Sequence, residues 1–422
     1  MKAGFAEVDI TPPVGTHKIG WLKDIVSDHV LDPLFARAAV MESGDERIAL
    51  VQLDTLFAPA PLVEKVRQGI EAKHGFPGRS VMVAATHSHA GPAIADSGAV
   101  RRDDAYVETL LGKVVSVFGQ ALAGLQLAEI GFGRAFEFDV PHNRRVVMRD
   151  GTARTHGNFS DPQALCFEGP IDPEVAVLAA RPAGGGPLLG MLVNFACHPT
   201  HHGPDGALSA GYPGVLAREM KSPGCPVTMF LQGAAGNIHT ADPARGGADR
   251  TMEEVGKMLA DDAAAALEKM EFTGRVRLGC RSRTVQLPFR QPTDEQVKGA
   301  ARGAQRFVDP NIYDQQIPEI VERMRRQGTQ PAEVQMLTVN DVALVSIPGE
   351  LFVEHGLRIK QQSWPRQVLV VECANGTVGY IPTQEAFQRG GYETTFGPPS
   401  QLAPQAGDLL VDAAVELIGQ GI

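Results

Sequence analysis

The sequence predicts an α/β fold in which a mixed, largely buried β-sheet core is flanked by helices. Short apolar runs alternate with amphipathic segments along most of the chain, and this alternation is typical of strands covered by helices. Most of these runs lead into a polar turn and then a helix-like segment. The 422 residues, of which 43% are hydrophobic, can bury a large core. We expect a single domain over 1–422.

The first half of the chain supplies two strand–helix units. The run 47–53 predicts a buried strand, and the segment 61–70 follows as a helix with Pro61 at its first turn. The run 80–85 predicts the next strand. The segment 104–125 predicts a long helix, because its apolar residues recur at helical spacing.

The second half continues the alternation. Apolar runs predict further strands at 188–196, 227–231, 341–347 and 367–372. Thr251 and Glu254 have the spacing of a capping box, which predicts a helix through Ala266. Another helix is expected to begin at Glu350. The segment 292–331 is rich in Arg, Gln and Glu and predicts a peripheral helical excursion.

Composition excludes several classes of partner. The net charge is −10, with acids and bases interspersed, which argues against nucleic acid or an anionic membrane. No apolar run has the length of a membrane span, and the first residues lack the pattern of a signal peptide. The five cysteines form no CxxC pair and are expected to be reduced, buried residues. We expect a cytoplasmic protein that acts on a small molecule.

Two histidines, His87 and His89, come directly after the run 80–85. Alternation along a strand would put both imidazoles on one face of the sheet. Imidazole is a common zinc ligand, so the pair predicts half of a metal site. A single buried histidine is more often an ordinary core residue, and the prediction therefore depends on the other strand ends.

Three further strand ends carry chemically capable side chains. His198 follows the run 188–196, Glu350 follows 341–347, and Tyr380 lies beyond 367–372. Ligands gather at strand ends in open α/β sheets, and histidines with a carboxylate at successive ends favour a metal site. Cys197 should face away from His198 into the core. Tyrosine is an uncommon ligand and is usually a core or rim residue, so the prediction for Tyr380 rests least on its chemistry.

The loop Gly233–Asn237 follows a predicted strand and consists of small residues. Backbone N–H groups of such a loop can approach a developing negative charge, which predicts an oxyanion-binding role for Ala235 and Gly236. Glycine-rich turns are also often purely structural. Asn237 could add an amide donor, or it could be a turn or cap residue.

An ordered set of segments resembles the catalytic domain of the neutral/alkaline (non-lysosomal) ceramidase family. The segments span nearly the whole chain and are Asp9–Pro13, Asp32–Arg37, Ala85–Pro92, Asn194–His198, Tyr212–Gly214, Gln232–Asn237, Pro348–Glu350 and Gly379–Pro382. The resemblance implies one zinc ion per chain, held by residues at four matching positions, which are His87, His198, Glu350 and Tyr380.

The same resemblance implies roles for two other side chains. His89 would lie beside the reaction centre, where it could orient water or pass a proton to the leaving group. Arg144, in the segment Asn143–Arg145, would bind substrate.

Two departures from the ceramidase pattern bear on the substrate. The family carries a serine in its glycine-rich loop, whereas this chain has Gly233-Ala-Ala-Gly-Asn237, so an attack by that serine is not expected. The chain also ends soon after the tyrosine segment, where ceramidases continue into a further domain. We therefore expect a substrate other than ceramide.

The sequence thus favours a zinc-dependent hydrolase of a small soluble amide or ester, above all of a non-peptide C–N bond, in which zinc-activated water attacks the carbonyl. A metallo-phosphoesterase is the alternative that would use Asp54, His29 and Asp32. A non-catalytic binding protein on the same scaffold is a third hypothesis, because the loop serine is missing.

Overall fold

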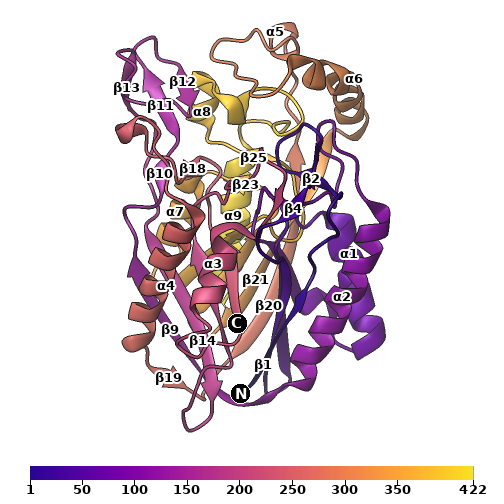
Figure 1. Ribbon diagram of the computed structural model, residues 1–422, viewed down its shortest axis with the longest axis vertical. Helices are drawn as coiled ribbons and strands as arrows, with labels where there is room; N and C mark the ends of the chain where they lie inside the picture. Colours follow the sequence, from indigo (N-terminus) through magenta and orange to yellow (C-terminus); the bar gives the residue numbers. More distant parts are fainter. Residues whose placement is uncertain (422) are drawn as a thin grey trace.

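The computed structural model describes residues 1–421. Its core consists of two β-sheets stacked between layers of helices (Figure 1). β19 (Phe272–Thr273) adds a short ninth strand to the larger sheet by pairing with β9. The other strands of that sheet follow the order β17 (Thr228–Gln232), β15 (Gly190–Phe195), β14 (Glu174–Pro182), β9 (Gln126–Phe136), β1 (Lys2–Asp9), β5 (Phe35–Ser43), β6 (Glu46–Leu53) and β7 (Val81–Ala85).

The smaller sheet packs face to face against the larger one. Its strands follow the order β20 (Leu278–Pro288), β21 (Thr329–Val339), β22 (Val342–Ile347) and β24 (Gln367–Glu372). Leu50 and Leu192 of the large sheet share one apolar cluster with Leu344 of the small sheet. Both sheets contain parallel and antiparallel pairs. The predicted α/β class with a mixed, buried sheet core is therefore confirmed.

Helices cover the two outer faces. α1 (Ala60–His74) and α2 (Asp104–Ala123) pack on the β1–β7 part of the large sheet, and α3 (Gly211–Glu219) and α4 (Met252–Glu268) pack on the β14–β17 part. Figure 1 shows these pairs on opposite sides of the molecule. α6 (Pro310–Gln327), α7 (Val353–Gln362) and α9 (Ala406–Gly419) lie against the small sheet and its extensions.

The large sheet is bent, and this bend brings distant strand ends together. β1 and β9 pair at only two positions, Lys2–Leu127 and Ala3–Gln126, so the two halves of the sheet can turn toward each other. The outer strands β17 and β7 consequently lie in contact. β7 also hydrogen-bonds to the chain beyond β24, through Val83 and Asn375. The ends of β7, β15, β22 and β24 therefore meet in one region.

Short elements complete the chain between and beyond the sheets. They are β2 (His17–Ile19), β3 (Ile25–Val26), β4 (His29–Val30), β8 (Gly91–Pro92), β10 (His142–Asn143), β11 (Arg145–Met148), β12 (Ala153–Thr155), β13 (Ala164–Phe167), β16 (Ala207–Leu208), β18 (Ile238–His239), β23 (Glu350–Leu351), β25 (Tyr380–Ile381), α5 (Asp294–Val297) and α8 (Gln384–Arg389).

Some sequence predictions need correction. Glu350 lies in β23, and the following helix begins at Val353 rather than at Glu350. The excursion 292–331 contains α5 and α6 but ends inside β21, which begins at Thr329. Cys166 is exposed and Cys280 is half-buried, so the prediction of buried cysteines is wrong for these two. All five cysteines are free thiols.

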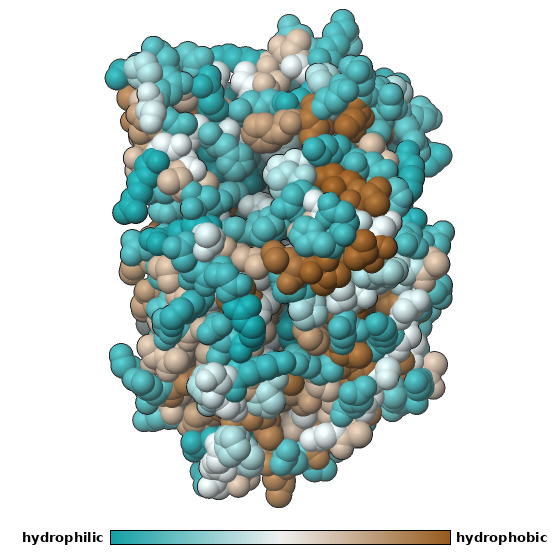
Figure 2. Space-filling model, viewed as in Figure 1, coloured by the Kyte–Doolittle hydropathy of each residue, from teal (hydrophilic) through white to brown (hydrophobic). Residues whose placement is uncertain are grey.

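No helix within residues 1–421 combines the length and the apolar character that crossing a membrane requires. The face drawn in Figure 2 is largely hydrophilic, with hydrophobic residues gathered in small patches.

Candidate metal centre

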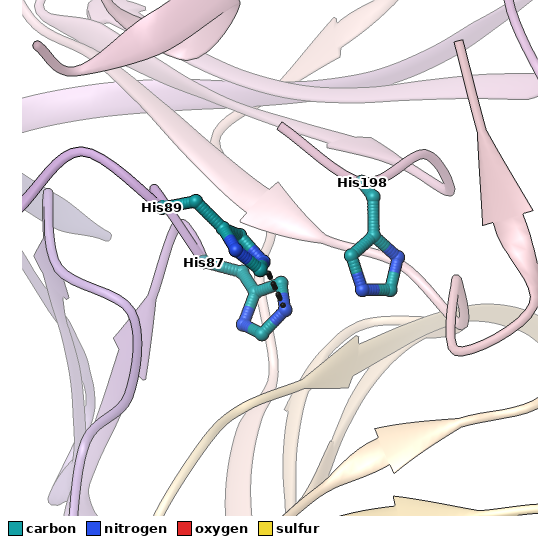
Figure 3. Close-up of side chains that lie close together, drawn as sticks. All are labelled: His87, His89 and His198. Carbon is teal, nitrogen blue, oxygen red and sulfur yellow. Dashed lines mark hydrogen bonds between the residues drawn. The ribbon is translucent and has the colours of Figure 1, made fainter. Parts of the chain in front are cut away.

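Three histidines and one glutamate converge where the strands end. One ring nitrogen from each of His87, His89 and His198 lies within 4.8 Å of the others (Figure 3). The Nε2 atoms of His87 and His89 are 3.2 Å apart. Glu350 Oε2 lies 3.4 Å from His87 Nε2 and 3.3 Å from His198 Nε2. The structure thus brings four of the predicted residues into one buried cluster.

The two neighbouring histidines meet for a different reason than strand alternation. β7 ends at Ala85, and His87 has a φ of +65°. This left-handed conformation is unfavourable for a side chain such as histidine and turns the chain sharply. Backbone strain of this kind persists where the surroundings hold it and is common at functional sites.

Backbone carbonyl groups fix the orientation of each imidazole. Nδ1 of His87 lies 2.9 Å from Leu56 O, and Nδ1 of His89 lies 2.9 Å from Gly20 O. Nδ1 of His198 lies 2.6 Å from Ala235 O. A carbonyl oxygen only accepts hydrogen bonds, so each Nδ1 carries the hydrogen. Each Nε2 is left with a free lone pair, as in histidines that bind metals.

The chemistry of this donor set fits a cation. Three Nε2 lone pairs and one carboxylate face one another, and none of them supplies a hydrogen to the others. Burial and the nearby Arg144 lower the pKa of His198 to about 4. Neutral imidazoles with an ionised carboxylate are the preferred ligands of zinc.

Tyr380 lies beside this cluster, and Arg144 lies behind Tyr380. Tyr380 pairs with Glu350 across β23 and β25. Nη2 of Arg144 donates to the Tyr380 hydroxyl at 3.1 Å and to Gly236 O at 2.8 Å, and Nε donates to Glu393 at 2.8 Å. Burial raises the pKa of Tyr380 well above its usual value, and Glu350 adds to this effect, so the phenol is neutral.

The glycine-rich loop is engaged within the protein, which contradicts its predicted oxyanion role. The N–H groups of Gly233 and Gly236 donate to Phe195 O and Leu351 O, each at 2.8 Å. Ala235 does not line the cavity above the histidines. Instead of free N–H groups, the loop offers two carbonyl oxygens, Ala235 O to His198 and Gly236 O to Arg144.

Asn237 is a structural residue in this arrangement. Its Oδ1 accepts the N–H of Val353 at 2.9 Å, and its Nδ2 donates to both carboxylate oxygens of Glu354. Because Asn237 is fully buried and both ends of its amide are occupied, it ties the loop to the first turn of α7. Of the two predicted alternatives, the cap-like role is the one that the contacts favour.

A cavity of about 660 Å³ opens above the cluster. His87, His89, Glu350 and Tyr380 line the cavity and are all buried, so they form its base. Its walls and mouth include Leu22, Leu56, Phe57, Asp96, Arg101, Gln316, Glu319, Ile320, Arg323, Gln330, Val378, Tyr392 and Gln401. Part of the wall is α6, so the segment expected to be peripheral borders the site. Arg144 does not line the cavity.

The residues suggested for a metallo-phosphoesterase each have other partners and do not form one cluster. Asp54 pairs with Arg37 at 3.0 Å, Asp32 accepts the Ala210 N–H at 2.8 Å, and His29 is exposed. Within residues 1–421, the histidine trio is the one group of three or more His, Cys, Asp or Glu side chains at metal-binding separation. This ligand set for a phosphoesterase is therefore wrong.

Comparisons with known proteins agree with the motif resemblance. No family model matches the chain. The chain is 25% identical to the neutral ceramidase of Pseudomonas aeruginosa over 466 aligned positions, which cover 91% of this chain and 67% of the relative.

Two solved structures share the fold. The crystal structure of the Pseudomonas aeruginosa neutral ceramidase superposes with a TM-score of 0.75 at 20% sequence identity. The match covers 99% of this chain and 74% of the ceramidase chain. A ceramidase complexed with C2 superposes with a TM-score of 0.76 at 20% sequence identity. This match covers 99% of this chain and 75% of that ceramidase chain. The predicted resemblance to neutral ceramidases is confirmed.

Proposed function

We propose, from this homology, that the protein is a zinc-dependent hydrolase of a non-peptide C–N amide bond. The observation that carries the proposal is the convergence of three imidazole nitrogens and one carboxylate at the base of a cavity. A cluster of neutral histidines and an ionised carboxylate at the base of a substrate-sized cavity is typical of a hydrolytic metal site. Amide hydrolysis is proposed by analogy with the ceramidase relatives.

His87, His198 and Glu350 would hold one zinc ion per chain, with the Tyr380 hydroxyl as a further ligand candidate. When bound, the ion would supply Lewis-acid activation of water and of the scissile carbonyl. The carbonyl oxygens of Leu56 and Ala235 keep His87 and His198 oriented for this purpose.

His89 is suited to moving the proton. Burial, together with the neighbouring His87 and His198, lowers the pKa of His89 well below its ordinary value, so its Nε2 is unprotonated at neutral pH. His89 lines the cavity. It would accept a proton from the attacking water and donate it to the leaving nitrogen.

Tyr380 takes the oxyanion role that the loop cannot take. Arg144 donates to the Tyr380 oxygen, so the hydroxyl hydrogen is free to point elsewhere. That hydrogen would bond to the carbonyl oxygen as negative charge develops there. Arg144 acts through Tyr380 in this proposal and does not contact the substrate directly.

The substrate is proposed to be a small amide other than ceramide, in a cytoplasmic setting. The cavity volume of about 660 Å³ is large enough for a small-molecule ligand of ordinary size. The test is a panel of N-acyl amines, matching esters and a short-chain ceramide, assayed after zinc reconstitution, after chelation and after zinc is restored. Zinc-dependent cleavage of small amides is expected. Cleavage of ceramide alone, or of no amide, would contradict the proposal.

A further inference from the structure

The mouth of the cavity carries charged side chains of its own, apart from the histidines, Glu350 and Tyr380 at its base. α6 presents Gln316, Glu319, Ile320 and Arg323 to the cavity, and their spacing puts all four on one face of the helix. The segment 95–101 forms part of the opposite wall and contributes Arg101. Nε2 of Gln316 donates to Gly98 O, so the helix and this segment are joined beside the cavity.

The two arginines at the mouth have no carboxylate partner among residues 1–421. Arg101 donates weakly to the carbonyl oxygens of Gly98 at 3.3 Å and Val100 at 3.5 Å. Arg323 donates to Gln401 Oε1 and, at 3.4 Å, to Gln327 Oε1, and its guanidinium lies 5.2 Å from the centre of the Phe289 ring. Both guanidinium groups thus keep donors that a ligand could use.

Other arginines near the site are matched to acids. Arg144 pairs with Glu393 at 2.8 Å, and Arg145 pairs with Glu393 at 2.6 Å and with Glu168. The arginines at the mouth differ from these two because they have no such partner. A guanidinium that has lost part of its hydration shell is stabilised by an anion that accepts two parallel N–H hydrogen bonds from it.

The acidic side chains at the mouth are placed differently from Arg323. Asp96, Glu319 and Arg101 are exposed to water, whereas Arg323 is half-buried. Burial lowers the pKa of Arg323, and Glu319 one turn away partly offsets this effect. An incoming anion would therefore gain more from Arg323 than an incoming cation would gain from the hydrated carboxylates.

We propose, on the premise that the site hydrolyses amides, that its substrates carry a carboxylate or another anionic group, which Arg101 and Arg323 bind at the mouth of the cavity. The anionic group projects from the scissile bond toward α6. It belongs to either the acyl or the amine portion of the substrate, because the mouth recognises the charge.

Three matched amides test the inference. N-hexanoylglycine carries a carboxylate on the amine portion, N-butylglutaramate carries one on the acyl portion, and N-hexanoylethanolamine is neutral. The zinc-reconstituted full chain should show a kcat/KM at least about tenfold higher for one of the anionic amides than for the neutral one, as expected for charge-assisted hydrogen bonds. Equal values, or a preference for the neutral amide, would overturn the inference.

Substitutions assign the preference to the two arginines. Arg101→Gln and Arg323→Gln should each lower the ratio of anionic to neutral kcat/KM about threefold, and the double variant should abolish the preference. The controls are Arg102→Gln, next in sequence and paired with Asp104, and Arg326→Gln in the last turn of α6, neither of which lines the cavity. A preference that survives the double variant would overturn the assignment.

Binding separates this inference from the proposed function. If none of the amides is hydrolysed, the proposed function fails, and calorimetric binding of the two anionic amides, N-hexanoylglycine and N-butylglutaramate, then decides the inference. Binding that weakens at least about tenfold in the double variant, with both controls unaffected, supports an anion site. No binding, or equal binding in wild type and double variant, overturns it.

Discussion

At the scale of single residues, the imidazole rings of the site share one arrangement. His87, His89 and His198 each direct Nδ1 to a backbone carbonyl and Nε2 to the common centre. The carbonyls come from three separate segments, at Leu56, Gly20 and Ala235. The proposed metal affinity would therefore depend on backbone geometry as well as on the ligands.

His89 offers the sharpest test of roles within this trio. His89→Gln should leave the bound zinc near one per chain and lower kcat about 100-fold to 10⁴-fold, because proton transfer is lost. Zinc content and kcat measured on the same preparation decide the role. A parallel loss of zinc would make His89 a ligand. His29→Gln, at an exposed position, is the control that should change neither.

Glu393 links the site to acid stability. Burial by itself would raise its pKa, but Arg145 and Arg144 lower the pKa to about 2, from the ordinary value of 4.5. A depressed pKa stabilises the fold at pH values above 4.5, and this stabilisation is lost as pH falls toward 2. The shift corresponds to about 3 kcal/mol.

Glu393→Gln should therefore lower the free energy of unfolding by about 3–5 kcal/mol at pH 7, since it also removes the carboxylate partner of the buried Arg144 and one of the two carboxylate partners of Arg145. The difference from wild type should shrink between pH 4.5 and pH 2. Urea denaturation across this range measures it. Equal pH dependence in both proteins would contradict the assignment, and the exposed Glu322→Gln should follow wild type.

At the scale of elements, Asn237 connects the glycine-rich loop to α7. Asn237→Ala would leave the buried Val353 N–H without an acceptor, and should lower the free energy of unfolding by about 1–3 kcal/mol. Denaturation and steady-state kinetics of the variant are the measurements. Unchanged stability with a reduced kcat would restore the predicted amide-donor role. Asn311→Ala, exposed on α6, should behave as wild type.

Elements with strong local patterns could be predicted from the sequence. The buried runs of β6, β7, β22 and β24 and the amphipathic helix α2 occur close to their predicted positions. The long strands β1, β5, β9, β14, β20 and β21 are not evident from the sequence. In β20, for example, the middle residues Arg281–Thr284 are all polar and exposed, so the strand is defined by its pairing with β21 and has no clear local pattern.

The convergence of the site residues could be inferred from strand ends, but their contacts could not. Whether the N–H groups of Gly233 and Gly236 are free depends on Phe195 and Leu351, which are distant in sequence. The position of α6 at the cavity depends on packing against the small sheet. Such long-range contacts carry no local signal, which is why α6 had no predicted role.

At the scale of the whole molecule, the apolar layer between the sheets joins the two halves of the chain. Leu344 is 2% exposed and lies in this layer. Leu344→Ala should lower the free energy of unfolding by about 2–5 kcal/mol, because it leaves a cavity in a packed core. Urea denaturation measures the loss, and Val14→Ala at an exposed position should cost little.

If the chain is a single domain, as predicted, both of its halves should unfold together. The chain has two tryptophans, Trp21 near His89 and Trp364 between α7 and β24. Fluorescence of the single-tryptophan variants Trp21→Phe and Trp364→Phe should report coincident unfolding transitions. Two separate midpoints would show that the halves unfold independently.

The buried donor cluster at the meeting point of both sheets is the feature on which the whole account depends. Its most direct test is the metal content of the untagged protein, purified without added metal and measured by elemental mass spectrometry, beside His87→Ala and His29→Ala. We predict about one zinc per chain in wild type and in His29→Ala, and a stoichiometric loss in His87→Ala. No bound metal in wild type, with none taken up on reconstitution, would contradict the account.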